Sequence, residues 1–154
     1  MKIVDFLKRE NCVAALSSTD KEDTLRELCD LLHKNGDVEN GSAIFEAVIN
    51  RERLGSTGIG NHVAIPHAKT TEAKYITAAF GLSRDGVEYF AVDDKPVRLI
   101  FLLVASDNAT GEHLKALARI SRLLKSDTFR KDIESVKSPD EIYETIERED
   151  LKLG

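Results

Sequence analysis

His67 ends a stretch of sequence whose composition suits chemistry on an anionic group. It follows Pro66 and the apolar residues 63–65, and a glycine-rich loop at residues 55–60 lies just upstream. Pro66 fixes its own φ and biases the residue before it toward extended geometry, so His67 should leave a strand end in a defined direction. A neutral imidazole is nucleophilic near pH 7, because its unperturbed pKa is about 6.5. His67 is therefore the candidate chemical centre of the protein.

The loop before His67 could bind the oxygens of a phosphate. Glycine backbone amides form anion-binding concavities, and hydroxyl groups add further donors. The candidate phosphate-binding residues are Ser56, Thr57 and Gly58. Lys69 is also close in sequence, but it is equally suited to docking or to solubility.

Arg51 and Glu52 lie in the last turn of a helix predicted over residues 41–54. At 100° per residue, Glu52 falls near the middle of the apolar stripe of this helix and Arg51 at its margin. An unpaired buried charge is very costly, so one interpretation is a local Arg51–Glu52 pair that ties the helix to its neighbours. The other is that Arg51 binds an anion next to His67, since a planar guanidinium suits phosphate.

His113 is a second candidate, in the first turn of a helix predicted over residues 110–125. The positive end of the helix dipole disfavours a charged imidazole there, which leaves a neutral ring able to donate one hydrogen bond. Simple packing against the start of the helix is the alternative. The predicted core side of this helix consists of Leu114, Leu117, Ile120, Leu123 and Leu124.

Several other chemistries are excluded by their missing motifs. The glycine spacing is neither GxGxxG nor a P-loop, and the chain has no GxSxG or HExxH motif. The spacing of His62 and His67 is not a recognised metal-binding pattern. We therefore predict neither a metal nor a cofactor.

Composition predicts one globular domain over residues 1–154. Hydrophobic residues make up 42% and charged residues 32% of the chain, and the net charge is -5. This charge argues against a nucleic-acid or anionic-membrane surface, and no apolar run approaches the roughly 20 residues of a membrane helix. Cys12 and Cys29 have no metal or redox spacing. They are expected to be buried, reduced thiols in a cytoplasmic protein.

The hydrophobic pattern predicts helices before and after a group of strands. Residues 1–18 suggest a short helix or turn and then an extended segment at 13–17, and Thr19 to Glu22 resembles a capping box. The predicted helices are 20–34, 41–54, 110–125, 127–134 and 139–149. The predicted strands are 63–65, 75–82, 87–91 and 97–105, with the second and third forming a hairpin around residues 84–86.

The run at 97–105 is apolar almost throughout, which is typical of a strand covered on both faces. The predicted fold class is therefore α/β (α+β): a single-domain, three-layer α/β/α sandwich whose central mixed β-sheet is flanked by helices on both faces.

These residues together resemble a known family. Gly-Ser-Thr-Gly-Ile-Gly at 55–60, followed by Val-Ala-Ile-Pro-His-Ala at 63–68, closely resembles the phosphorylation-site signature of the fructose–mannitol class (type 2) of enzyme IIA proteins. These proteins belong to the bacterial phosphoenolpyruvate:sugar phosphotransferase system (PTS). The resemblance extends to Arg51 and Glu52 upstream and to His113 and Leu114 downstream.

The resemblance implies that His67 accepts a phosphoryl group at Nε2 from the phosphohistidine of HPr or an HPr-like carrier, with Arg51 and His113 flanking it. In the sugar-transport branch the group then passes to a cysteine of an enzyme IIB. In the nitrogen-regulatory branch the phosphorylation state controls binding to other proteins. The stand-alone chain and the Ser-Thr-Gly-Ile-Gly stretch favour the regulatory branch. A non-catalytic anion-binding module is a third possibility.

His62 departs from the family pattern, which commonly has glycine there: GNGVAIPH rather than GNHVAIPH. If the backbone needs φ > 0 at this position, histidine carries a cost. His62 could also add a third imidazole near the site.

Overall fold

The computed structural model describes all 154 residues of the chain. It contains five α-helices, one 3-10 helix and six strands. The helices are η1 (Ile3–Asp5), α1 (Lys21–Lys34), α2 (Gly41–Leu54), α3 (Thr110–Leu124), α4 (Asp127–Glu134) and α5 (Pro139–Lys152). The strands are β1 (Leu7–Val13), β2 (Gly58–Gly60), β3 (Val63–Ala64), β4 (His67–Thr70), β5 (Thr77–Val87) and β6 (Val97–Ser106). None of the helices combines the length and the apolar character needed to cross a membrane.

The strands form one mixed sheet in the order β1-β5-β6-β3-β2, and β4 also pairs with β6. β5 and β6 are antiparallel, whereas β3 and β4 are both parallel to β6. Val63 of β3 lies beside Leu99, and His67 of β4 lies beside Leu103. The two short strands therefore follow one another along the same edge of β6, and this register places His67 further along that edge.

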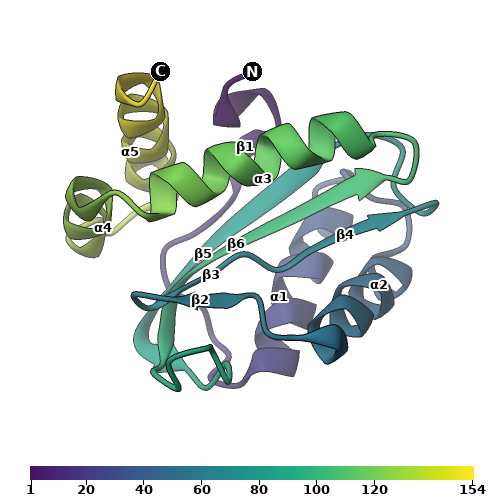
Figure 1. Cartoon of the computed structure of the whole chain (residues 1–154), viewed down its shortest axis with the longest axis horizontal. Helices are drawn as coiled ribbons and strands as arrows, with labels where there is room; N and C mark the ends of the chain where they lie inside the picture. Colours follow the sequence, from purple (N-terminus) through teal and green to yellow (C-terminus); the bar gives the residue numbers. More distant parts are fainter.

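Helices cover both faces of the sheet, with α1 and α2 on one side and α3, α4 and α5 on the other (Figure 1). Alternate residues of β6 enter two separate clusters of 21 and 20 buried residues, because successive side chains of a strand point to opposite faces. Leu99, Phe101 and Leu103 belong to the first cluster, and Ile100, Leu102 and Val104 to the second. The predicted three-layer α/β/α sandwich is confirmed.

The predicted hairpin around residues 84–86 is wrong. β5 runs without a break through this region, and its antiparallel partner is β6. The chain beyond Val87 turns toward the start of α1, where the N–H of Glu88 donates to the carbonyl of Thr19. Tyr89 is fully buried, whereas Phe90 is 67% exposed. Only part of the apolar residues at 87–91 therefore serves the core, and they do not form a second strand.

Two predictions near the N-terminus also need correction. The extended segment is β1, at Leu7–Val13 rather than at 13–17. Three consecutive exposed residues interrupt the alternation of buried and exposed side chains by which a strand is usually predicted. The N-cap of α1 is Asp20, whose side chain accepts from the N–H of Asp23 at 2.8 Å, rather than Thr19. An aspartate caps a helix at least as well as a threonine.

Cys12 and Cys29 are buried and unpaired, as predicted. Burial raises the pKa of each thiol to about 12. Because a thiol reacts as its thiolate, these cysteines serve packing rather than chemistry.

Candidate active site

His67 is half-buried at the start of β4. Its Nδ1 lies 2.8 Å from the carbonyl oxygen of Ile65. A carbonyl can only accept, so Nδ1 carries the proton and the lone pair lies on Nε2. Burial lowers the pKa of His67, and the charge of Arg51 adds to this, whereas the bond to Ile65 and the charge of Glu52 act in the opposite sense. The ring is therefore neutral at pH 7, with Nε2 as its nucleophilic atom.

His113, in the first turn of α3, lies next to His67 and is only 4% exposed. The two ring centroids are 5.6 Å apart and the ring planes are inclined by 49°. Burial, supplemented by the charges of His67 and Lys69, lowers the pKa of His113 to about 4. Its Nε2 is buried and has no hydrogen-bond partner. Such an unsatisfied group costs roughly 1–3 kcal/mol, so it marks a position where a bound group could supply the missing bond.

The predicted core side of α3 is wrong at its first position. Leu114 is 61% exposed, whereas His113 beside it is buried. The first turn of α3 packs against His67, and the apolar contact of the helix begins only at Ala116. Leu117 is partly buried.

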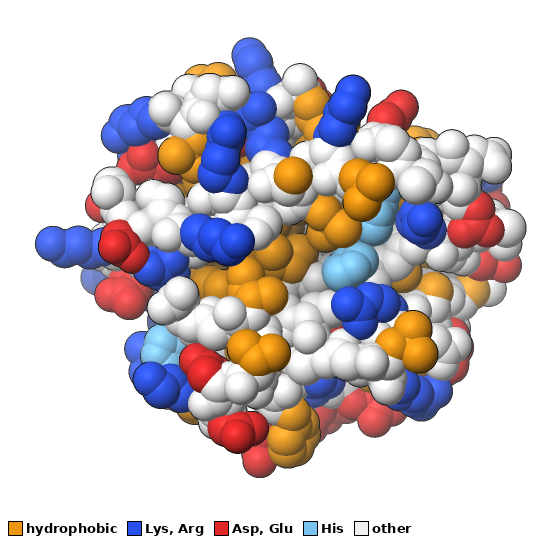
Figure 2. Space-filling model, viewed as in Figure 1, with side chains coloured by type: hydrophobic (Ala, Val, Ile, Leu, Met, Phe, Trp, Pro, Cys, Tyr) orange, Lys and Arg blue, Asp and Glu red, His pale blue; other side chains and the backbone are white.

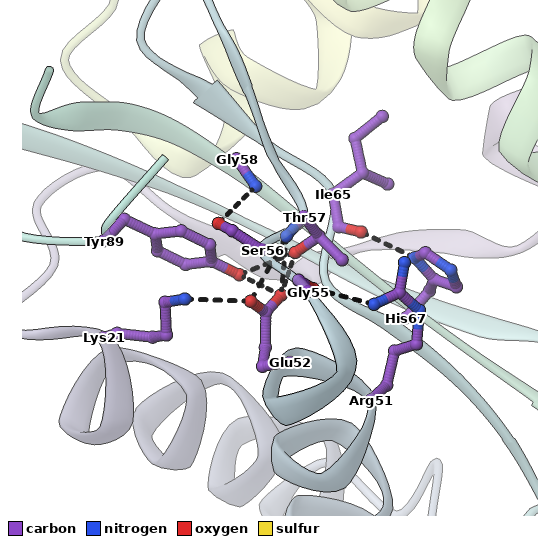
Figure 3. A network of polar contacts seen from close by, with 10 residues as sticks. All are labelled: Lys21, Arg51, Glu52, Gly55, Ser56, Thr57, Gly58, Ile65, His67 and Tyr89. Carbon is purple, nitrogen blue, oxygen red and sulfur yellow. Dashed lines mark hydrogen bonds and ion pairs between the residues drawn. The ribbon is translucent and has the colours of Figure 1, made fainter. Parts of the chain in front are cut away.

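Arg51 reaches from the end of α2 toward the ring of His67 (Figure 3). Its Nη1 donates to the carbonyl oxygen of Gly55 at 2.8 Å. The local Arg51–Glu52 pair that the sequence allowed is not formed. Because a guanidinium has five N–H donors, Arg51 can hold the glycine loop and still donate to an anion beside His67.

Glu52 instead anchors a buried polar network (Figure 3). The ammonium of Lys21 lies 3.0 Å from its carboxylate, and the hydroxyl of Tyr89 donates to it at 2.8 Å. The N–H of Thr57 donates at 3.2 Å, and the Thr57 hydroxyl is bonded to the same carboxylate. Burial, followed by the charge of Glu52, raises the pKa of Tyr89 well above its ordinary value, so the phenol remains a donor. The network fixes the glycine loop to α2.

Ile65 extends this network to His67. Its N–H donates to the carbonyl of Thr57 at 3.0 Å, and its own carbonyl accepts from His67. A continuous series of hydrogen bonds thus runs from Glu52 through Thr57 and Ile65 to the imidazole. Sequence reasoning missed the parts played by Lys21, Tyr89 and Ile65. Its only indication of the network was the position of Glu52 in an apolar stripe.

The three predicted phosphate-binding residues are placed differently from one another. Thr57 is buried and bonded to Glu52, so in this structure it braces the loop. The N–H of Gly58 donates to Ser56 Oγ at 3.1 Å, and a Cβ at Gly58 would lie 2.6 Å from the Cβ of Ala91. Phosphate binding by these residues stays a prediction. Ser56 accepts from Gly58 and keeps a hydroxyl hydrogen that forms no bond within the protein.

His62 does not join this site. The partner of Val63 lies four positions before the partner of His67 along β6, a distance of roughly 13 Å at strand geometry. The expectation of a third imidazole near His67 is therefore wrong. His62 does adopt a positive φ, of 64°, and its Nδ1 lies 2.7 Å from the carbonyl oxygen of Pro96.

Apolar side chains are exposed next to the residues of the site. Leu114 follows His113 in α3, and Leu54, which is 85% exposed, directly precedes the glycine loop. Figure 2 shows histidine side chains at the surface of this face, among hydrophobic and basic side chains. Such a surface suits contact with another protein.

The fold and the site define a class of protein: a three-layer α/β domain that presents a neutral histidine beside a second histidine and an arginine. The profile of the family described as "Phosphoenolpyruvate-dependent sugar phosphotransferase system, EIIA 2" matches residues 5–149. The chain belongs to this family and is a PTS EIIA phosphotransfer component.

Relatives from both branches of the family resemble the chain. It is 39% identical over 150 residues to the PTS system fructose-specific EIIABC component of Bacillus subtilis, covering 97% of this chain and 24% of that protein. It is 35% identical to the nitrogen regulatory protein of Bradyrhizobium diazoefficiens, covering 95% of each. The crystal structure of the nitrogen regulatory protein IIA-Ntr from Neisseria meningitidis superposes with a TM-score of 0.86 at 34% identity, covering 94% of this chain and 98% of that one.

Proposed function

We propose that His67 is the phosphoacceptor and that its Nε2 takes a phosphoryl group from the phosphohistidine of HPr or an HPr-like carrier. The observation that carries this proposal is the hydrogen bond from Nδ1 to Ile65, which leaves the lone pair on Nε2. In the transfer, the bond from phosphorus to the donor's nitrogen breaks as the bond to Nε2 forms. Donor and acceptor are both histidines, so the step is nearly balanced in free energy and reversible.

Arg51 and His113 stabilise the group in transit. Phosphoryl transfer depends mostly on positioning and on stabilising charge on the equatorial oxygens. Arg51 supplies a fixed positive charge and N–H donors. His113, neutral because of its low pKa, supplies a hydrogen bond from Nε2, the atom that has no partner in the unphosphorylated protein. The 5.6 Å between the ring centroids leaves the two imidazoles close enough for both to contact one phosphoryl group.

The phosphorylation state of His67 would regulate target proteins in nitrogen or carbon metabolism. PTS EIIA domains interact with HPr and IIB partners, and the similarity to nitrogen regulatory proteins along nearly their whole length supports the regulatory branch. The exposed Leu54 and Leu114 would lie in the docking surface. These partners and the reduced Cys12 and Cys29 suit a cytoplasmic protein.

A sugar-transport role is the second candidate, favoured by the 39% identity to the fructose-specific component of Bacillus subtilis. In that case the phosphoryl group would pass from His67 to the cysteine of a IIB domain. Rapid transfer to a fructose-type IIB would support this role, and an adjacent gene for IIB or IIC would agree with it.

The test of the proposed function is phosphorylation in vitro. The protein is incubated with phosphoenolpyruvate, enzyme I and HPr, and its mass and the acid lability of the product are measured. We expect the gain of one acid-labile phosphoryl group, absent in His67→Ala and present in His62→Ala as the matched control. Failure of the wild type to gain phosphate, or unchanged phosphorylation of His67→Ala, would refute the proposal and favour a non-catalytic anion-binding module.

A further inference from the structure

A cavity of about 330 Å³ lies at the turn between β2 and β3, away from His67. Three arginines from separate elements line it: Arg84 of β5, Arg98 of β6 and Arg130 of α4. The only acidic residue in its lining is Glu134. The cavity is therefore positively charged, in a chain whose net charge is -5. None of these residues takes part in the site around His67.

Two of the arginines are held in place by the surrounding backbone. Arg84 donates to the carbonyl oxygen of Glu134 at 2.9 Å and also to that of Val136. Arg130 donates to the carbonyl oxygen of Leu124 at 2.8 Å and pairs with Asp127. Each of these guanidinium groups has further N–H donors. Arg98 is exposed and forms no side-chain hydrogen bond or ion pair, so its entire guanidinium remains available.

The floor of the cavity is apolar and one wall carries an imidazole. Leu82, Leu99 and Ile133, all buried, form the floor. His62 contributes its ring, which is oriented by the hydrogen bond from Nδ1 to Pro96 and so has Nε2 unengaged. Ser83 adds a hydroxyl that accepts from the N–H of Gly86 and can still donate. An apolar floor with a few convergent polar groups is the usual make-up of a small-ligand site.

We infer that this cavity is a binding site for a small organic anion, a phosphate ester with a flat or apolar body. The body rests on the leucine and isoleucine floor, and the arginines bind the phosphate through charge-assisted hydrogen bonds. The volume lies at the lower end of the range for ligand pockets, roughly 300–1,000 Å³. The positive groups surround a single hollow and the chain as a whole is acidic, so an extended polyanion such as nucleic acid fits poorly.

The experiment is an NMR titration of the isotope-labelled full chain with 1-naphthyl phosphate, 1-naphthol and inorganic phosphate. We expect saturable shifts in the amides of residues 61–62, 82–84, 98–99 and 130–134 with 1-naphthyl phosphate. Neutral 1-naphthol lacks the phosphate, and inorganic phosphate lacks the aromatic body. Each should bind at least about tenfold more weakly than 1-naphthyl phosphate. Arg98→Gln should weaken the binding of 1-naphthyl phosphate by about tenfold or more. Arg122→Gln, the matched control at an exposed position of α3, should change it by less than about twofold.

Absence of saturable binding, equal binding of 1-naphthol, equal binding of inorganic phosphate, or shifts centred on Arg51 and His67 would each overturn the inference. So would equal effects of Arg98→Gln and Arg122→Gln. Phosphorylation of His67 is measured separately on the same variants and should be unchanged, so this site and the proposed function can fail independently.

Discussion

His62 and His67 make the same hydrogen bond in different surroundings. Each donates from Nδ1 to a backbone carbonyl, at 2.7 Å for His62 and 2.8 Å for His67. Like His67, His62 is half-buried, but it lies in a turn and adopts a left-handed backbone conformation. His67 is half-buried beside His113 and within the influence of the Arg51 charge. The tautomer alone therefore does not distinguish His67, the proposed phosphoacceptor, from His62.

The difference lies in what supports each ring and what faces its Nε2. The bond of His67 ends a series of hydrogen bonds that begins at buried Glu52, and that of His62 ends at the loop residue Pro96. His67 also has a neighbour, His113, with an unsatisfied buried nitrogen. Positioning and fixed donors are the two contributions that phosphoryl transfer requires, and they are combined only at His67.

The largest expected effect comes from removing that neighbour. We expect His113→Ala to slow phosphorylation by HPr about 10- to 100-fold. The phosphoryl oxygens would lose a hydrogen-bond donor, and the ring of His67 would lose a packing surface. The measurement is a rapid-quench time course with phospho-HPr, accompanied by circular dichroism to verify that the variant is folded. His62→Ala serves as the control, with a rate within about twofold of wild type, since it has no part in positioning. Equal rates in His113→Ala and wild type would remove His113 from the site.

Glu52→Gln tests the support beneath His67. The substitution leaves the ammonium of Lys21, whose side chain is 16% exposed, without its charged partner. We expect the free energy of unfolding to fall by about 2 kcal/mol. This is less than the roughly 3–5 kcal/mol typical of breaking a fully buried ion pair, because Lys21 keeps some contact with water. Urea denaturation measures this. The control is Glu39→Gln, which breaks an exposed pair with Lys74 and should lower the free energy of unfolding far less, because solvent screens an exposed pair. Similar losses in both variants would contradict a special role of the network.

This network also marks the limit of what the sequence could predict. The layers of the fold follow from local patterns, such as the apolar run that became β6, and the candidates His67, Arg51 and His113 follow from residue types and spacing. The partners of Glu52 could not be deduced, because Lys21 and Tyr89 meet it only through packing of α1, α2 and the segment after β5. The prediction of a hairpin was wrong for the same reason, because a tertiary contact with Thr19 determines the path of the chain after Val87.

The pH dependence of stability should reveal that His67 and His113 are neutral in the folded protein. The unfolded chain has histidine pKa values of about 6.5, whereas the folded pKa is about 4 for His113 and is lowered for His67. Below about pH 6.5 the unfolded state therefore binds more protons, and stability falls as the pH drops toward 4. Between about pH 7.5 and 5, we expect wild type to lose about 1 to 2 kcal/mol more than His113→Phe. Equal losses in urea denaturation would mean that His113 is not buried in neutral form.

The smallest effect should come from His62, where backbone and side chain can be separated. His62→Ala and His62→Gly both lose the hydrogen bond to Pro96, but only alanine keeps a Cβ at the left-handed φ of 64°. Left-handed geometry costs a non-glycine residue about 1 kcal/mol, partly offset by the larger entropy of glycine in the unfolded chain. We therefore expect His62→Gly to be more stable than His62→Ala by up to about 1 kcal/mol in urea denaturation, with phosphorylation of His67 unchanged in both. If His62→Ala were the more stable variant, the left-handed turn that directs His62 toward the arginine-lined cavity would not persist in solution. The site at His67 would be unaffected, because its support comes from Glu52.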